Sequence, residues 1–188
     1  VHEVSHGVAA YSLGDPTAKL QGRLTLNPIP HIDLYGSVLL PFLMVTLGSP
    51  IVFGYAKPVP YNPYHLKDLK WSPALVAAAG PGSNIALAVS LGLIYQVINV
   101  IVPLPLEVLS LFITAVALNL ALAVFNSIPI PPLDGSKVLK PFLPESITNS
   151  QIYHSFERTG FILLLVFILF FGQVLTPVIR GLTQFLLA

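Results

Sequence analysis

Four long apolar stretches decide what this chain can fold into. A helix needs roughly 20 mostly apolar residues to cross the hydrocarbon core of a bilayer, and stretches 35–53, 74–102, 106–125 and 161–187 come close to that length or exceed it. Only 9% of the 188 residues are charged, whereas a soluble domain carries about 25%. We therefore expect an all-α polytopic protein, a bundle of transmembrane helices in a lipid bilayer.

Charge and cysteine content exclude several classes of function. The formal net charge of +1 leaves no basic face for nucleic acid, so we expect no nucleic-acid partner. The absence of cysteine excludes disulfides, thiolate metal sites and a cysteine nucleophile.

The segments outside these stretches complete the expected architecture. Residues 1–13 are too short to span and are expected to be the second half of a helix, so residues 1–188 are interpreted as a single membrane domain that is N-terminally incomplete. Residues 19–26 alternate loosely between turn signals, which predicts a short membrane-associated β element. Stretch 35–53 contains two prolines, so it either crosses the bilayer or re-enters it.

Lysine and arginine in the short loops predict the orientation. The loop before residue 74 has three lysines, the turn at 102–106 has no basic residue, and the segment after residue 125 has three basic residues. The first and third of these loops are therefore expected on the cytoplasmic side of the cell membrane. If stretch 35–53 crosses the bilayer, Lys19 and Arg23 would face outward, against the rule. Residues 1–13 are expected to run from the cytoplasmic side outward.

The chain opens on an H-E-x-x-H motif, His2-Glu3-Val4-Ser5-His6. On a helix, a spacing of four residues places both imidazoles on one face, where they can bind one zinc ion, and Glu3 can take a proton from water beside it. Ionisable residues inside a membrane are costly, which favours a functional role. The alternative is a solvated helix end at the membrane interface.

A catalytic zinc needs a third protein ligand. Asp134 is the best candidate, because it follows a proline-rich segment, and non-helical backbone at membrane depth is tolerated only inside protein or along a wet cavity. A plain Asp-Gly turn is the alternative for Asp134. His31, His65 and His154 are the other candidate ligands, and all three lie in polar loops.

Three ordered motifs resemble the site-2 protease family of intramembrane zinc metalloproteases, in its prokaryotic form. They are His2-Glu3-x-x-His6, the segment Ala79-Gly80-Pro81-Gly82-Ser83-Asn84, and Asn126-x-x-Pro129-x-x-Pro132-x-Asp134-Gly135. The resemblance covers residues 1 to about 140. It implies that His2, His6 and Asp134 bind one Zn²⁺, that Glu3 is the general base, and that Asn126 positions the substrate or its oxyanion.

The expected function is therefore zinc-dependent hydrolysis of peptide bonds within or near transmembrane segments of membrane protein substrates. The active site is expected in the cytoplasmic half of the bilayer. Two alternatives remain at this level, a zinc-binding homologue without peptidase activity and a metal-ion transporter.

Overall fold

The computed structural model describes residues 1–48, 54–102 and 104–188, and every regular element in these ranges is a helix. In chain order the elements are α1 (His2–Ser12), α2 (Thr17–Leu20), η1 (Ile29–His31), η2 (Leu34–Leu39, a π-helix), α3 (Leu40–Thr46), η3 (Pro63–His65), α4 (Ser72–Ile101), α5 (Leu106–Asn126), α6 (Asp134–Leu139), η4 (Lys140–Phe142), α7 (Glu145–Thr148) and α8 (Gln151–Leu187). The prediction of an all-helical architecture is confirmed for the described residues.

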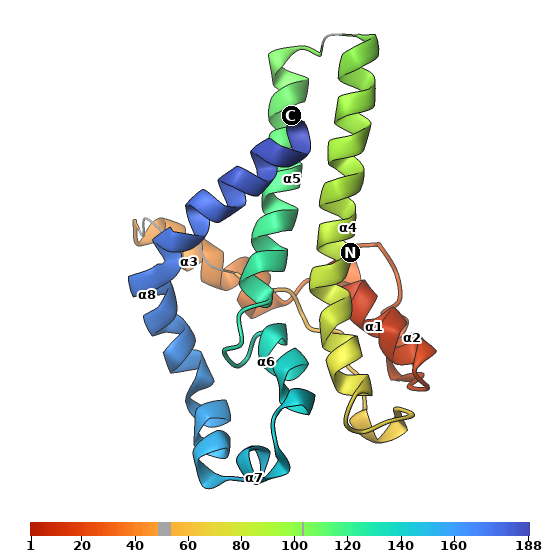
Figure 1. The fold of residues 1–188 in the computed structure, drawn as a ribbon, viewed down its shortest axis with the longest axis vertical. Coiled ribbons are helices and arrows are strands. Elements are labelled where there is room, and N and C mark those ends of the chain that lie inside the picture. Colours follow the sequence, from red (N-terminus) through yellow and green to blue (C-terminus); the bar gives the residue numbers. More distant parts are fainter. Residues whose placement is uncertain (49–53, 103) are drawn as a thin grey trace.

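Helices α4, α5 and α8 are each long and apolar enough to cross a membrane. They correspond to predicted stretches 74–102, 106–125 and 161–187, although α8 begins ten residues earlier than its stretch, at Gln151. α4 and α5 form an antiparallel pair joined by a short turn (Figure 1). Ala88, Val116 and Leu120 are buried between these two helices.

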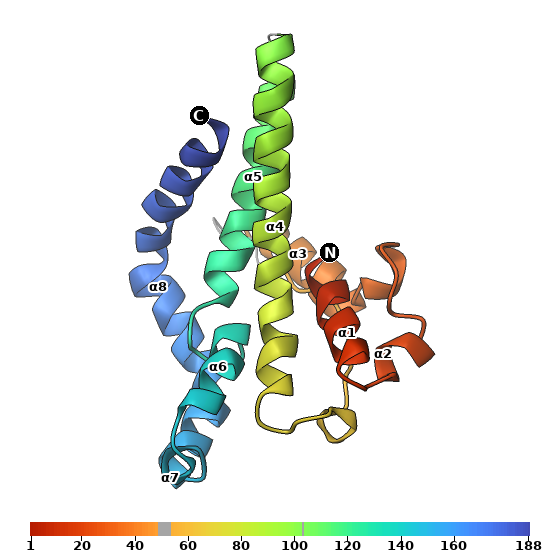
Figure 2. The ribbon, with the colours of Figure 1, turned by 45° about the vertical axis from the view of Figure 1, so that its right-hand side comes forward.

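Helix α1 runs antiparallel to α4. His6 lies against Val76, whereas Gly80, one turn further along α4, contacts both His6 and His2. The N–H of Lys67 donates to the Leu13 carbonyl, so the end of α1 adjoins the loop that leads into α4. The expected direction of residues 1–13 is therefore wrong: α1 descends toward the end of the molecule where α4 begins (Figure 2).

Asp15 connects the turn after α1 to the loop before α4 through hydrogen bonds. Its side chain is fully buried and accepts hydrogen bonds from Thr17, from the Asn62 N–H and from the His65 ring. Burial alone would raise the pKa of this carboxyl group, but these hydrogen bonds favour the charged form and hold its pKa below the usual value. The carboxylate thus fixes the loop that leads to α4.

The predicted β element at residues 19–26 is wrong. Residues up to Leu20 belong to α2, and Gly22 then turns the chain with a positive φ of 65°. Leu24 packs on α1 beside Gly7. Leu20 and Leu26, the other apolar residues of the alternation, are largely exposed, so the alternation does not mark a buried strand face.

Stretch 35–53 does not form a long helix in its described part. η2 and α3 together cover only Leu34–Thr46, and residues 49–53 lie outside the described ranges. The N–H of Tyr55 donates to the Gly36 carbonyl at 3.1 Å, and Ser37 donates to the Tyr55 carbonyl. Because its two ends meet, the segment returns to the point where it began, which favours the re-entrant alternative.

Helix α8 approaches the rest of the structure closely at two glycine contacts. A Cβ at Gly160 would lie 2.5 Å from Pro131 Cβ, and a Cβ at Gly92 on α4 would lie 2.8 Å from the Leu186 carbonyl oxygen. Between these contacts α8 changes direction, and Pro177 lies inside it (Figure 1). The first contact joins α8 to the segment that carries Asp134.

Candidate metal centre

Helix α1 presents two imidazoles from one face, and α4 holds them. Nδ1 of His6 donates to the Val76 carbonyl at 2.7 Å, which leaves the lone pair of Nε2 free to bind a metal. Gly80 lies directly against both imidazole rings. A Cβ there would overlap the His6 ring and lie 2.7 Å from His2 Cε1. The motif containing Gly80 thus supplies close helix approach at the two histidines.

Asp134 is the first residue of α6, and its position depends on how the chain leaves α5. Pro129, Pro131 and Pro132 prevent the helix from continuing, and the chain doubles back onto the end of α5. Gly135 is pressed against the carbonyl oxygens of Ser127 and Ile128, where no side chain would fit. This return places the carboxylate of Asp134, buried at 8% exposure, opposite α1.

Three side chains from distant parts of the sequence converge. Oδ2 of Asp134 lies 3.1 Å from Nε2 of His2 and 3.2 Å from Nε2 of His6, and all three ligand atoms lie within 4.8 Å of one another. Tetrahedral zinc ligands, at about 2.0–2.1 Å from the ion, lie about 3.3 Å from one another. The donor set and its spacing therefore fit a zinc ion. In the described part of the chain this is the only group of three or more such side chains with this spacing.

Glu3 lines the same cavity as the three converging side chains. The cavity has a volume of about 310 Å³ and extends between α1, α4, α6 and the segment 58–61. Oε2 of Glu3 accepts a hydrogen bond of 2.9 Å from the Val59 N–H, so the carboxylate is anchored at one oxygen. The structure thus brings His2, Glu3, His6 and Asp134 into one cavity.

Asn126 also lines this cavity, at the last position of α5. Its Nδ2 donates to the Leu122 carbonyl within the same helix, which occupies one of the two amide N–H groups.

The three alternative histidines have other partners. His31 contacts the Thr25 carbonyl, His65 contacts Asp15, and His154 lies 3.8 Å from Glu157. None of these three belongs to the converging group.

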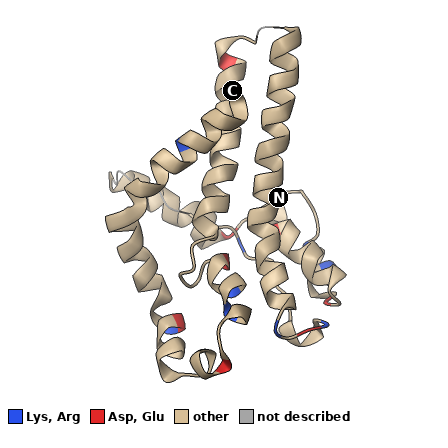
Figure 3. Ribbon diagram, viewed as in Figure 1, with Lys and Arg blue, Asp and Glu red and all other residues tan. Residues whose placement is uncertain are grey.

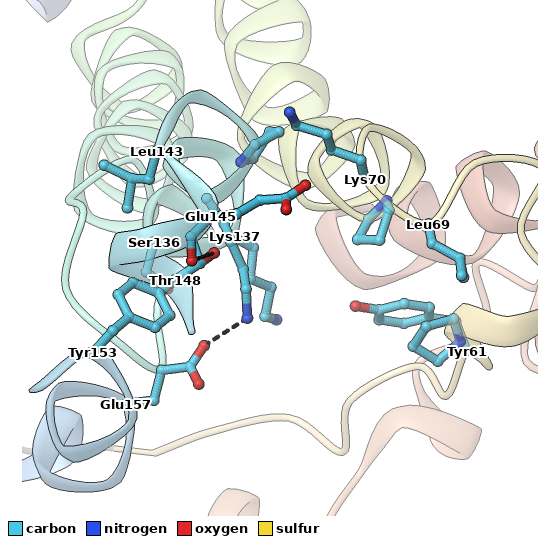
Figure 4. Close-up of a pocket in the computed structure, with 14 residues that line it drawn as sticks. Tyr61, Leu69, Lys70, Ser136, Lys137, Leu143, Glu145, Thr148, Tyr153 and Glu157 are labelled. Carbon is cyan, nitrogen blue, oxygen red and sulfur yellow. Dashed lines mark hydrogen bonds and ion pairs between the residues drawn. The ribbon is translucent and has the colours of Figure 1, made fainter. Parts of the chain in front are cut away.

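A second, larger cavity adjoins the first. It has a volume of about 510 Å³ and shares Tyr61 and Lys137 with the cavity that contains Glu3. Figure 4 shows Tyr61 across this cavity from Tyr153 and Glu157. Lys137 also approaches Asp134, with Nζ 3.7 Å from Oδ1. The two cavities are therefore adjacent, and the second has several polar side chains along its walls.

Several features of the candidate site were not predicted from the sequence. The Val76 carbonyl and the Val59 N–H are backbone groups, which carry no signal in the residue type. Asn84, from the Gly-Pro motif, is 1% exposed, and its Nδ2 has no hydrogen-bond partner among the described residues. Nδ1 of His2 also has no hydrogen-bond partner among the described residues.

Sequence comparisons agree with this arrangement. The sequence model of peptidase family M50 matches residues 97–171, which include Asp134. The chain is 37% identical over 174 residues to the protein named "Putative zinc metalloprotease YwhC" from Bacillus subtilis (strain 168), and this match covers 88% of the chain and 74% of the relative. No solved structure matches the chain.

Two mycobacterial relatives are longer. The chain is 30% identical over 175 residues to "Putative zinc metalloprotease Rip2" of Mycolicibacterium smegmatis, covering 90% of the chain and 62% of that protein. It is 32% identical over 151 residues to the protein of the same name from Mycobacterium tuberculosis (strain H37Rv), covering 78% of the chain and 54% of that protein. From the extent of the match to the Bacillus protein, the chain belongs to peptidase family M50, the site-2 protease family.

Proposed function

We propose that the chain is a zinc metalloprotease that hydrolyses peptide bonds within or next to transmembrane segments of membrane proteins. The observation that carries this proposal is the convergence of His2, His6 and Asp134 in the cavity that also contains Glu3. Membership of peptidase family M50 and the names of the relatives support zinc metalloprotease chemistry.

In this proposal His2, His6 and Asp134 hold one zinc ion. Two imidazoles and one carboxylate, with a fourth position open, are typical of a catalytic zinc site. When bound, zinc supplies Lewis-acid chemistry, since it acidifies water and polarises a carbonyl group.

Glu3 is the proposed general base. One oxygen of its carboxylate accepts the Val59 N–H, so the other is available to take a proton from the attacking water. The same carboxyl group then passes this proton to the nitrogen of the departing amine, which returns Glu3 to its charged form. Asn126 has one amide N–H in use and a second that can donate to the developing oxyanion of the substrate.

The proposed placement is in the cell membrane, with residues 1–188 acting as one membrane-embedded domain. α4, α5 and α8 would cross the bilayer, and the segment that includes η2 and α3 would re-enter it. His6 lies opposite Val76 and Gly80, which at 1.5 Å per residue are about 6 and 12 Å from the start of α4. With the lysine-bearing end in the cytoplasm, the site would lie in the cytoplasmic half of a core about 30 Å thick.

Substitution of Glu3 by glutamine tests the proposal. Glutamine keeps the shape of the side chain but cannot accept the proton, so Glu3→Gln should abolish cleavage of a single-span substrate in liposomes while zinc stays near one per chain. Metal analysis and a gel-based cleavage assay give the two readings. Turnover retained in this variant would sink the mechanism. A wild-type chain that binds zinc without cleaving any substrate would favour the peptidase-inactive alternative, and zinc flux into the liposomes would favour the transporter.

A further inference from the structure

Arg23 is buried without an acidic partner. Its side chain is 6% exposed, and its guanidinium forms no ion pair within the described part of the chain. Nη2 donates to the carbonyls of Lys57 and Pro58, at 2.8 and 3.3 Å, and Nε has no partner among the described residues. A buried charge that is paired only with carbonyl groups is costly, so its presence at this position needs an explanation.

One peptide plane lies between Arg23 and Glu3. The Pro58 carbonyl and the Val59 N–H belong to the same peptide unit, whose two polar groups are held in one plane and point in opposite directions. Arg23 binds the carbonyl side, and Glu3 Oε2 binds the N–H side at 2.9 Å. Hydrogen bonds in such a chain polarise one another, so the guanidinium strengthens donation from the Val59 N–H to Glu3.

Side-chain packing keeps this peptide in register with α1. Gly7 lies one turn after Glu3, on the same face of the helix. A Cβ at Gly7 would lie 2.8 Å from Val59 Cγ1 and 2.6 Å from Leu24 Cδ2, so both neighbouring segments press on α1 at this point. Leu24 follows Arg23 in the chain, and Val59 belongs to the peptide that binds Glu3. The face of α1 that carries Glu3 therefore also positions the segment that contains Arg23 and the peptide between Pro58 and Val59.

We propose that Arg23 is a positioning residue for Glu3 and acts through the peptide between Pro58 and Val59. This inference rests on the proposed function, in which Glu3 is the general base. Arg23 fixes the orientation of the peptide, the peptide anchors one oxygen of the Glu3 carboxylate, and the other oxygen is held ready for the proton of the attacking water. Without Arg23 the carboxylate would rotate among several orientations.

Hydrogen exchange tests the connection without any assay of cleavage. Pro58 and Pro60 have no N–H, so the stretch 57–61 reports only three amides, those of Lys57, Val59 and Tyr61. In Arg23→Met, exchange at Val59 should rise by roughly tenfold or more, since the N–H loses its fixed acceptor. The Lys57 amide, which donates to the His31 carbonyl, should stay protected. Arg158→Met, at an exposed arginine, is the matched control and should change neither amide.

Kinetics separate positioning from general stability. Arg23→Met should lower kcat by roughly tenfold to a hundredfold with KM and zinc content near wild type, because a misplaced catalytic group slows chemistry and leaves binding intact. Arg23→Lys should recover part of kcat, since an ammonium group can still donate to a carbonyl. If Arg23→Met does not fold, the exchange and kinetics of Arg23→Lys, compared with wild type, decide the question.

Several results would overturn the proposal: unchanged exchange at Val59, unchanged kcat, or a fall in kcat matched by loss of zinc. If Val59 exchange rises in Arg23→Met as expected but the wild-type protein cleaves nothing, the connection between Arg23 and Glu3 is supported and the protease function is rejected. The two failures are therefore distinguishable.

Discussion

At the residue scale, contacts with the protein itself orient the side chains of the candidate metal centre. The Val76 carbonyl orients the His6 ring, and Gly80 leaves room for both imidazoles against α4. Gly135 lets α6 begin directly against the end of α5, which sets the depth of the Asp134 carboxylate. Each of these contacts restricts the orientation of a candidate ligand, and such restriction would raise its affinity for a metal.

Removal of the Asp134 carboxylate should affect both zinc and activity. Loss of a neighbour of a metal ligand typically costs 10- to 100-fold in affinity, so loss of the ligand itself in Asp134→Ala should weaken zinc binding by about 100-fold or more. Zinc titration of the purified protein measures this, with Glu107→Ala as a control at the opposite, exposed end of α5. Full zinc content in Asp134→Ala would exclude Asp134 as a ligand.

Two glycines of α4 offer a matched comparison. A Cβ at Gly80 would collide with the His6 ring, whereas a Cβ at Gly82 would meet nothing within 4 Å. Both substitutions by alanine add the same helix propensity, of about 1 kcal/mol, so the difference between them isolates the contact with the histidines. We expect Gly80→Ala to weaken zinc binding by roughly 10- to 100-fold and Gly82→Ala to leave it unchanged. Equal zinc affinities in the two variants would contradict the geometry of the site.

The sequence indicated which side chains could act as ligands far better than which groups orient them. The spacing of His2 and His6 and the polar break at Asp134 are visible in the residue order. The Val76 carbonyl and the Val59 N–H are backbone groups of a kind that other residues also have. Which backbone group contacts a given side chain depends on the register between the two segments. That register is a property of the packed structure.

At the scale of elements, length and composition were sufficient for the three long helices and insufficient for the shorter segments. The loose alternation at residues 19–26 suggested a strand, but the chain turns at Gly22, and of the three leucines only Leu24 packs on α1, while Leu20 and Leu26 are exposed. The predicted direction of α1 was also wrong, because residues 1–13 carry no charge asymmetry that would fix their orientation. The hydrogen bond from Lys67 to Leu13 settles it.

The contact of α8 with the loop before Asp134 should be sensitive to the size of the side chain at position 160. A Cβ at Gly160 would lie 2.5 Å from Pro131 Cβ and 2.6 Å from its carbonyl oxygen, with backbone that cannot easily move. Such overpacking typically costs about 1–3 kcal/mol, so Gly160→Ala should unfold at a lower temperature in detergent. Gly181→Ala, on the same helix and facing open space, is the control and should not lower that temperature. Equal unfolding temperatures would mean that α8 is not held at Pro131.

At the scale of the whole molecule, charge is distributed along one axis. Most charged residues lie in the half away from the α4–α5 turn (Figure 3). Because α1 descends toward the start of α4, Lys19 and Arg23 lie at the same end as the lysines that precede α4. The expected exception to the positive-inside rule therefore disappears, and all the basic loops agree on one orientation.

Single cysteines can test that orientation, since the chain has no cysteine of its own. Pro105 precedes α5 at the α4–α5 turn, whereas Tyr64 in η3 and Asn149 after α7 belong to segments at the opposite end (Figure 1). All three side chains are exposed.

In intact cells, a membrane-impermeant thiol reagent should label Pro105→Cys and spare Tyr64→Cys and Asn149→Cys until the cells are permeabilised. Labelling of Tyr64→Cys from outside would invert the orientation. Since His6 lies only one to two turns from the start of α4, such an inversion would move the metal centre to the outer half of the bilayer and direct the products of cleavage away from the cytoplasm.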